Sequence, residues 1–369
     1  MRRYFAALLL IFLVFVAVLL VTPWGQDVFL AGLLLQEVTS GREGLLSAWT
    51  ARPRRETVAL RRNGREFHAD LYLPSQAEGR GGILLLHGLD PEGRRHPQLV
   101  HLANSLARAR RVVLVPDLHG LKHLRLRAED TLDVIRSFQY LESRSEVVRD
   151  ALGIAGISIG AGPGLIAAAH PTIRDRVRVV VSLGGYADLG TVITFVTTGH
   201  YSFKGVEGYV PPRDVVRLLF LHSNMDMLPA ADREEIQALL RAGPLPSVPP
   251  ASLSREGKAL YQLVVNRDDA AVPALLSALP SSIRREIEEL SPITQLHDLR
   301  AEVFLLHGIA DPLVPHTESL MLYEVLRDRG NVHLILLRLF QHVEPVDGIP
   351  VNEALTFYRF LFQVLRRLS

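Results

Sequence analysis

The stretch from residue 152 to residue 162 constrains the fold of this chain more than any other part of the sequence. An apolar run of strand length ends there in Gly-Ile-Ser-Ile-Gly, residues 156–160, and passes directly into small residues. This order is typical of a strand that ends in a sharp turn and continues at once as a helix, leaving Ser158 exposed. Glycines are needed on both sides because a Cβ there would collide with the strand or helix. The same five letters also arise by chance, so their meaning depends on the rest of the chain.

Apolar runs of strand length alternate with helical stretches on both sides of this motif. The expected strands are 83–86, 112–115, 152–157, 177–183, 303–306 and 333–337, and the main helices are 99–109, 129–141, 318–329 and 352–368. Such alternation predicts a parallel sheet covered by helices on both faces. Before it, Thr57–Leu73 alternates apolar and polar residues around Asn63-Gly64, which predicts a hairpin. We therefore expect an α/β, doubly wound fold with a mostly parallel eight-stranded sheet.

The alternation breaks between about 187 and 299. This region has helical spacing, is punctuated by prolines and contains no convincing buried strand. It is interpreted as a helical cap insertion within one domain that covers 57–369.

Composition excludes several classes of function. The 41 Lys and Arg residues nearly balance the 39 Asp and Glu residues and form no stripe, which argues against a nucleic acid partner. The absence of Cys excludes disulfides, thiolate catalysis and Cys-based zinc sites. There is no dinucleotide fingerprint or P-loop lysine, so no cofactor is expected. His119 and His123 lie near Asp117, but without a further ligand pattern they do not indicate a metal site.

The N-terminus is the compositional outlier. After Arg2 and Arg3, the run Tyr4–Val21 carries no charge and is long enough to span a bilayer. We interpret 1–25 as an uncleaved transmembrane anchor and 26–56 as a linker; a cleaved secretory signal is the alternative. The two arginines favour a cytoplasmic N-terminus, which would place the folded part of a single-pass protein outside the cytoplasmic membrane. If the segment is cleaved, the protein would be secreted.

Candidate catalytic residues follow the predicted strands, where a parallel sheet gathers functional side chains. Ser158, Asp311 and His342 come in that chain order, each after a strand. A serine hydroxyl is a poor nucleophile near neutral pH. It needs a histidine to take its proton, and the histidine needs a carboxylate to hold its tautomer and stabilise its cation.

The region from Thr57 onward resembles the α/β-hydrolase fold, both in the Gly-x-Ser-x-Gly elbow and in the order Ser, Asp, His. The resemblance implies that Ser158 is the nucleophile, Asp311 the acid after the seventh strand and His342 the general base. It also implies an oxyanion hole made by the backbone N–H groups of Leu89, after His87-Gly88, and Ile159. A cap between the sixth and seventh strands would cover the site and shape its pocket.

Other residues compete for these roles. Asp188 follows the sixth strand and is the alternative acid, although it is equally suited to cap a helix. His316 is the alternative base. His333 lies inside a predicted strand, and His87 and His307 belong to matching His-Gly turns, so structural roles are expected for these three.

The sequence thus predicts a membrane-anchored serine hydrolase that cleaves a carboxylic ester, either lipid-like or a small acyl ester. Peptidase, thioesterase and amidase activities would use the same site. A non-catalytic, hydrolase-like binding protein is the alternative from another class. The oligomeric state and the physiological substrate are left open.

Overall fold

The computed structural model describes residues 21–75, 79–338, 340–341, 344–345 and 350–369, together with Tyr4 and Val14. Within these ranges no helix has the length and apolar character needed to cross a membrane. Most of the predicted anchor, 1–25, lies outside the described residues.

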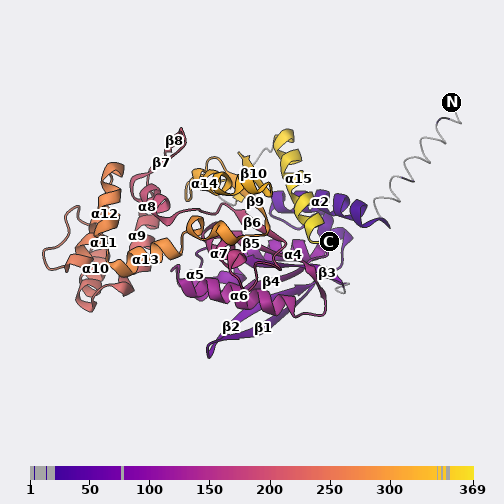
Figure 1. Cartoon of the computed structure of the whole chain (residues 1–369), viewed down its shortest axis with the longest axis horizontal. Helices are drawn as coiled ribbons and strands as arrows, with labels where there is room; N and C mark the ends of the chain where they lie inside the picture. The colour runs from indigo at the N-terminus through magenta and orange to yellow at the C-terminus, as the bar shows by residue number, and fades with distance from the viewer. Residues whose placement is uncertain are drawn as a thin grey trace.

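A mixed sheet of eight strands forms the centre of the fold (Figure 1), in the order β1-β2-β4-β3-β5-β6-β9-β10. β1 pairs antiparallel with β2, and β2 pairs antiparallel with β4; all other pairs are parallel. The prediction of an eight-stranded, mostly parallel sheet is therefore confirmed. The strands are β1 (Arg54–Arg62), β2 (Arg65–Leu73), β3 (Arg80–Leu86), β4 (Val112–Pro116), β5 (Val147–Ile157), β6 (Val179–Leu183), β9 (Glu302–Gly308) and β10 (Val332–Leu337).

The predicted hairpin is formed by β1 and β2. Arg62 pairs with Arg65, so the loop consists of Asn63 and Gly64 alone. Their φ angles are 49° and 80°, the left-handed conformation that a two-residue hairpin turn requires.

Helices cover both faces of the sheet because the central strands are apolar on both sides. On one face lie α6 (Ala128–Glu142), α7 (Ala161–Ala169) and α14 (Thr317–Leu326), which share a buried core with alternate strand residues. On the other face lie α2 (Pro23–Ser40), α4 (Pro97–Arg108) and α15 (Val351–Arg367), which share a second core with the intervening strand residues. The short helix α3 (Leu45–Trp49) lies between α2 and β1 in the chain, and α5 (His119–Lys122) lies between β4 and α6.

Helix α2 lies where the sequence predicted a linker, 26–56. It packs on α15 and α4, and two of its acidic residues are buried. Asp27 lies 3.0 Å from Arg111 and 3.2 Å from Arg366. Glu37 accepts a hydrogen bond of 3.1 Å from the hydroxyl of Ser105. Both carboxylates thus have partners far away in the sequence, so α2 packs as part of the folded domain.

The cap extends from one end of the sheet, at the left of Figure 1, and has its own apolar core. Its helices are α8 (Leu189–Thr198), α9 (Asp214–Asn224), α10 (Ala230–Ala242), α11 (Arg255–Val265), α12 (Val272–Ala278) and α13 (Ser281–Glu289). A small hairpin of β7 (His200–Phe203) and β8 (Val206–Tyr209) was not predicted. It turns at Lys204 and Gly205, with φ of 48° and 82°, and its strands are largely exposed, so they lack the apolar run that marks a buried strand.

Candidate active site

Ser158 lies at the sharp turn between β5 and α7, as the sequence predicted. Its φ angle is 53°, a left-handed conformation that is costly for any residue with a side chain. The turn closes because Gly156 and Gly160 have no Cβ: one on Gly156 would overlap the backbone of Ala161, and one on Gly160 the carbonyl oxygen of His87. The strain is thus imposed by packing on both sides, and Ser158 begins the short 3-10 turn Ser158–Gly160 that joins β5 to α7.

The loop after β3 lies over the serine. A Cβ on Gly88 would lie 3.2 Å from the Cβ of Ser158. Nδ1 of His87 lies 2.7 Å from the carbonyl oxygen of Gly88, and Nε2 accepts a 3.0 Å hydrogen bond from the N–H of Leu118. These partners assign the proton to Nδ1, and burial lowers the pKa of His87. The ring is therefore neutral and holds the loop in place.

The two predicted oxyanion donors lie beside the same cavity as Ser158. Leu89 follows the loop just described, and Ile159 follows the serine itself. The N–H of Leu89 makes no hydrogen bond with another residue in the described part of the chain. An N–H group left available at this position can bind an oxygen on the substrate.

Asp311 follows β9 and is held in a fixed orientation. Its Oδ1 accepts hydrogen bonds of 2.8 Å and 3.0 Å from the N–H groups of Leu313 and Val314. Its Oδ2 lies 3.4 Å from Nε2 of His307. That nitrogen is also 3.0 Å from the carbonyl oxygen of Val314, while Nδ1 lies 2.7 Å from the hydroxyl of Ser319. His307 thus supports the Asp311 loop, the structural role expected of it.

The alternative acid, Asp188, is the N-cap of α8. Its carboxylate accepts a 3.1 Å hydrogen bond from the N–H of Thr191. The N–H groups of Ala187 and Asp188 donate to the buried carboxyl of Glu318, at 3.0 Å and 3.1 Å, and the hydroxyl of Thr191 donates to it at 2.7 Å. Burial raises the pKa of Glu318 to about 7. This cluster fixes the point where the cap insertion leaves β6.

The predicted base, His342, lies outside the described residues. The described residues on either side of it form β11 (Phe340–Gln341) and β12 (Glu344–Pro345), which pair with each other.

The rival histidines also have partners. His316 is the N-cap residue of α14, and its ring centroid lies 5.6 Å from that of Tyr201. Burial lowers the pKa of His316, and the carboxylate of Asp311 opposes that shift. His333 stacks on Phe304 at 4.5 Å and lies 2.8 Å from a carboxylate oxygen of Glu302. For His333 this is the structural role that was expected.

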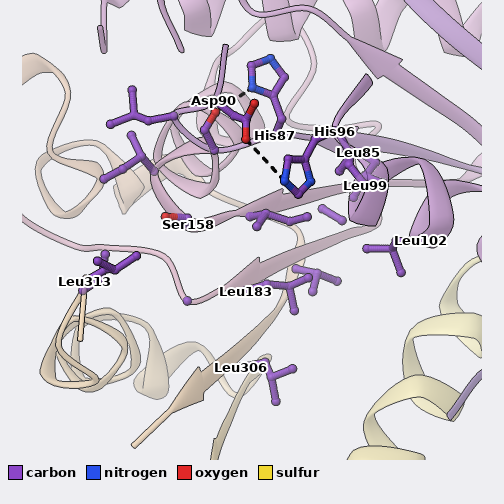
Figure 2. A pocket seen from close by; sticks show the side chains of 18 of the residues that line it. Leu85, His87, Asp90, His96, Leu99, Leu102, Ser158, Leu183, Leu306 and Leu313 are labelled. Atoms are coloured by element: carbon purple, nitrogen blue, oxygen red, sulfur yellow. Dashed lines mark hydrogen bonds and ion pairs between the residues drawn. The ribbon is translucent and has the colours of Figure 1, made fainter. Parts of the chain in front are cut away.

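A cavity of about 720 Å³ surrounds Ser158 and is lined mainly by apolar side chains. Figure 2 shows Ser158 and Leu313 beside it, with Leu183 and Leu306 from the ends of β6 and β9. We distinguish two parts. The cap lobe reaches between α8, α9 and α13; the sheet lobe reaches between the sheet and helices α2, α4 and α15.

Five charged or titratable residues among the described lining of the cavity were not sequence candidates: Asp90, His96, His101, Arg127 and Glu286. In Figure 2, Asp90 and His96 face each other near the serine, with 3.6 Å between Oδ2 and Nε2. In the cap lobe, Arg127 lies 3.5 Å from Glu286. Asp90 could have been found, because it follows the carboxyl end of β3. No sequence pattern marked Arg127 and Glu286, because they meet only when α13 packs over the loop before α6.

Ion pairs hold the cap to the sheet domain. Asp226, after α9, lies 2.8 Å from both Arg125 and Arg127. Arg127 also donates a 2.5 Å hydrogen bond to the carbonyl oxygen of Ser223. Arg127 and Ser223 both line the cavity, so these contacts form part of its wall.

The α/β sheet has eight strands, the strained Ser158 follows β5, and Asp311 follows β9. Together these features define a fold class. The chain has the α/β-hydrolase fold. No protein-family model and no curated protein sequence matches the chain. The evidence for the fold is therefore structural.

Several solved structures are similar to this chain. Acylaminoacyl peptidase from Pyrococcus horikoshii superposes with a TM-score of 0.55 and 16% identity, over 88% of this chain and 43% of that one. A 2,6-dihydroxy-pseudo-oxynicotine hydrolase superposes with a TM-score of 0.52 and 15% identity, over 85% of this chain and 68% of that one. A puromycin-hydrolysing peptidase from Mycobacterium tuberculosis superposes with a TM-score of 0.51 and 20% identity, over 84% of this chain and 38% of that one. The chain thus spans less than half of the acylaminoacyl peptidase, and at these identities the likeness establishes the fold alone.

Proposed function

We propose that this protein is a serine hydrolase that cleaves a carboxylic ester through an acyl-enzyme. One observation carries the proposal: Ser158 is held at a φ of 53° beside a large apolar cavity, with the loop of Gly88 and Leu89 packed against it. A strained serine in that position has no evident structural purpose, whereas a nucleophile must stand clear of the backbone.

In the proposed reaction His342 takes the proton from Oγ of Ser158 as Oγ bonds to the ester carbonyl carbon. The N–H groups of Leu89 and Ile159 stabilise the oxyanion. The carbon–oxygen bond to the alcohol then breaks, and the alcohol leaves with the proton from His342. Water next attacks the acyl-enzyme and gives its proton to His342. The acid is released, and Ser158 regains its proton. Asp311 orients His342 throughout.

An ester is favoured over a peptide by the lining of the cavity. Each residue of a bound peptide brings an N–H and a carbonyl group that need partners. The cavity is mostly apolar, and its charged residues Arg127 and Glu286 already face each other. An ester with an apolar chain leaves fewer polar groups unpaired. Peptidase, amidase and thioesterase activities remain the alternatives to be tested beside it.

A fluorophosphonate probe tests the nucleophile. We expect the wild-type protein to be labelled and Ser158→Ala not to be. Ser223→Ala is the matched control, because Ser223 lines the same cavity from α9 and has no proposed role in the chemistry; it should be labelled as wild type. If the wild-type protein is not labelled, the hydrolase-like binding protein replaces the enzyme.

Kinetics identify the acid and the bond that is cleaved. Asp311→Asn should lower kcat by several orders of magnitude, whereas Asp188→Asn should change it little because its carboxylate caps α8.

Matched p-nitrophenyl ester, thioester and anilide substrates should give the highest kcat/KM for the ester. A higher value for the anilide would favour a peptidase or amidase.

We further propose that residues 1–25 anchor the protein in the membrane with the catalytic domain outside the cytoplasm. The uncharged run from Tyr4 to Val21 supports this. So do the exposed rings of Trp24 and Trp49, 52% and 70% accessible, since tryptophan is enriched at membrane interfaces. Protease added to intact cells should digest the domain, and carbonate washing should leave the protein in the membrane fraction. Protection of the domain would contradict the orientation, and release by carbonate would contradict the anchor.

A further inference from the structure

The sheet lobe of the cavity has no counterpart among the sequence predictions. It is lined by Leu34 from α2, Leu102 from α4 and Leu361 from α15, facing Leu85 of β3 and Val181 of β6. It thus lies within the layer between the sheet and its helices, on the side away from α6 and α7. Figure 2 shows Leu99 and Leu102 of α4 along this side of the cavity.

The lobe begins near the serine and runs along β6. Val179, Val181 and Leu183 all line the cavity. They are alternate residues, so they share one face of the sheet. Leu183 pairs with Ile157, the residue before the serine, and Val179 pairs with Gly153 near the start of the same pairing. The four steps from Val179 to Leu183 correspond to about 13 Å.

The chemistry of this lobe is that of a hydrocarbon site. Along β6 and α15 it is lined by aliphatic and phenyl side chains such as Val181, Phe360 and Leu361. Water beside these side chains would find none of the two to four polar partners it needs, because the polar lining residues Gln98 and His101 lie on α4. A saturated chain, by contrast, exchanges water contacts for apolar contacts along its whole length. The polar residues Asp90 and His96 lie near Ser158, where an ester group would sit.

We propose that the sheet lobe binds the acyl chain of a long-chain ester, with the chain threaded from Ser158 along β6 between the sheet and helices α2, α4 and α15. This rests on the proposed function, because it takes Ser158 as the acylated residue. The acyl side is chosen because that chain stays attached to the serine until water attacks, which suits an internal channel. The alcohol leaves first, and the cap lobe offers it a polar contact in Asn224.

The first test is kinetic. In a series of p-nitrophenyl esters from acetyl to dodecanoyl, kcat/KM should rise by up to about tenfold for every two methylenes that enter the lobe. Leu102→Trp narrows the lobe and should lower kcat/KM for the dodecanoyl ester at least about tenfold while changing that for the acetyl ester less than about twofold. Leu219→Trp is the matched control: this leucine is also half-buried and lines the cap lobe. It should leave the preference for chain length unchanged.

The alcohol side is tested by comparing dodecyl acetate with p-nitrophenyl dodecanoate. Leu102→Trp should affect the dodecanoate and spare the dodecyl acetate. The reverse result would overturn the assignment to the acyl chain, and an equal effect of Leu219→Trp on long acyl chains would place the chain in the cap lobe instead.

A binding experiment separates this proposal from the proposed function. Ser158→Ala protein, which cannot turn over, is titrated with dansylundecanoic acid, and the probe is displaced with dodecanoic acid. We expect saturable binding that Leu102→Trp weakens about tenfold and Leu361→Trp weakens similarly, with circular dichroism spectra matching the parent. If the probe does not bind, or binds equally to all variants, the sheet lobe is not a chain site even where ester hydrolysis is confirmed. If the probe binds as expected but Ser158 is never labelled, the lobe holds and the enzymatic function fails.

Discussion

Gly160 and His87 are in close contact: a side chain on Gly160 would overlap the carbonyl oxygen of His87. The contact joins the turn that carries Ser158 and Ile159 to the loop that carries Leu89. Each segment therefore fixes the position of the proposed oxyanion donor on the other. We predict that Gly160→Ala displaces this loop and lowers kcat for an ester substrate about a hundredfold, the usual cost of losing one oxyanion donor.

Gly32→Ala provides the control for this substitution. Gly32 lies within α2, and a Cβ there would meet only the ring of Tyr358, at 3.9 Å. Alanine should leave kcat unchanged and slightly stabilise the helix. Steady-state kinetics with one ester measure both variants. Wild-type kcat in Gly160→Ala would show that the loop is not coupled to the turn.

The strain at Ser158 gives a prediction about stability. Because its φ is 53°, Ser158→Gly should be more stable than Ser158→Ala by about 1 kcal/mol, since glycine adopts this conformation without a Cβ clash. Urea unfolding of both variants measures the difference. At Ser223, in the helix α9, we expect the opposite: Ser223→Ala should be more stable than Ser223→Gly by about 1 kcal/mol, because glycine is the poorer helix former. Equal stabilities at position 158 would mean that the turn is not strained.

What could be predicted from the sequence depended on how local each signal was. The central strands were found because their apolar runs are buried on both faces, and the hairpin was found because Asn63-Gly64 fits a two-residue turn. Ser158 and the loop before Leu89 were found because each motif is contiguous and follows a strand. These signals are carried by neighbouring residues and need no knowledge of tertiary contacts.

The features that were missed depend on distant partners. Residues 26–56 were predicted to be a linker, but within α2 Asp27 and Glu37 are buried against Arg111 and Ser105, which are distant in the sequence. Likewise, the sheet lobe is formed by helices from opposite ends of the chain, so no local pattern marks it. The roles of His342, Leu89 and Ile159 in catalysis stay predictions from the order of residues and from resemblance.

The buried carboxyl of Glu318 should make stability depend on pH. Its pKa is raised from the ordinary glutamate value of 4.5 to about 7, chiefly by burial, which outweighs the hydrogen bonds from Thr191, Ala187 and Asp188. Between these two pH values the unfolded chain has lost this proton and the folded protein has kept it. The contribution of Glu318 to stability is therefore full below pH 4.5 and falls as pH rises toward 7.

Glu318→Gln should remove this loss. The amide can accept from Ala187 and Asp188 and donate to Thr191, whose hydroxyl lies 2.9 Å from the carbonyl oxygen of Asp188 and can donate to it. We expect the variant to gain stability relative to wild type by roughly 1–3 kcal/mol between pH 5 and pH 8. Urea midpoints measured across that range test this, and the difference between the two proteins cancels the contributions of other titrating groups. A constant difference would show that the pKa of Glu318 is not raised.

The last prediction concerns whether α2 is structurally part of the domain. Asp27 and Arg111 are both almost fully buried and lie 3.0 Å apart. Removal of the carboxylate leaves a buried guanidinium without its charge partner, so Asp27→Ala should lower the free energy of unfolding by about 3–5 kcal/mol. Glu43→Ala is the matched control: Glu43 is exposed just beyond the helix and should cost less than about 0.5 kcal/mol.

The double variant Asp27→Leu with Arg111→Met tests the cause of that loss. If the loss comes from the uncompensated charge, replacing both partners by apolar side chains should recover most of the stability lost in Asp27→Ala, because a buried ion pair is often no better than apolar packing. Urea unfolding of the full chain in detergent measures all of these variants. If Asp27→Ala is as stable as Glu43→Ala, then α2 rests on the domain without stabilising it, and the linker predicted from the sequence is the better description of residues 26–56.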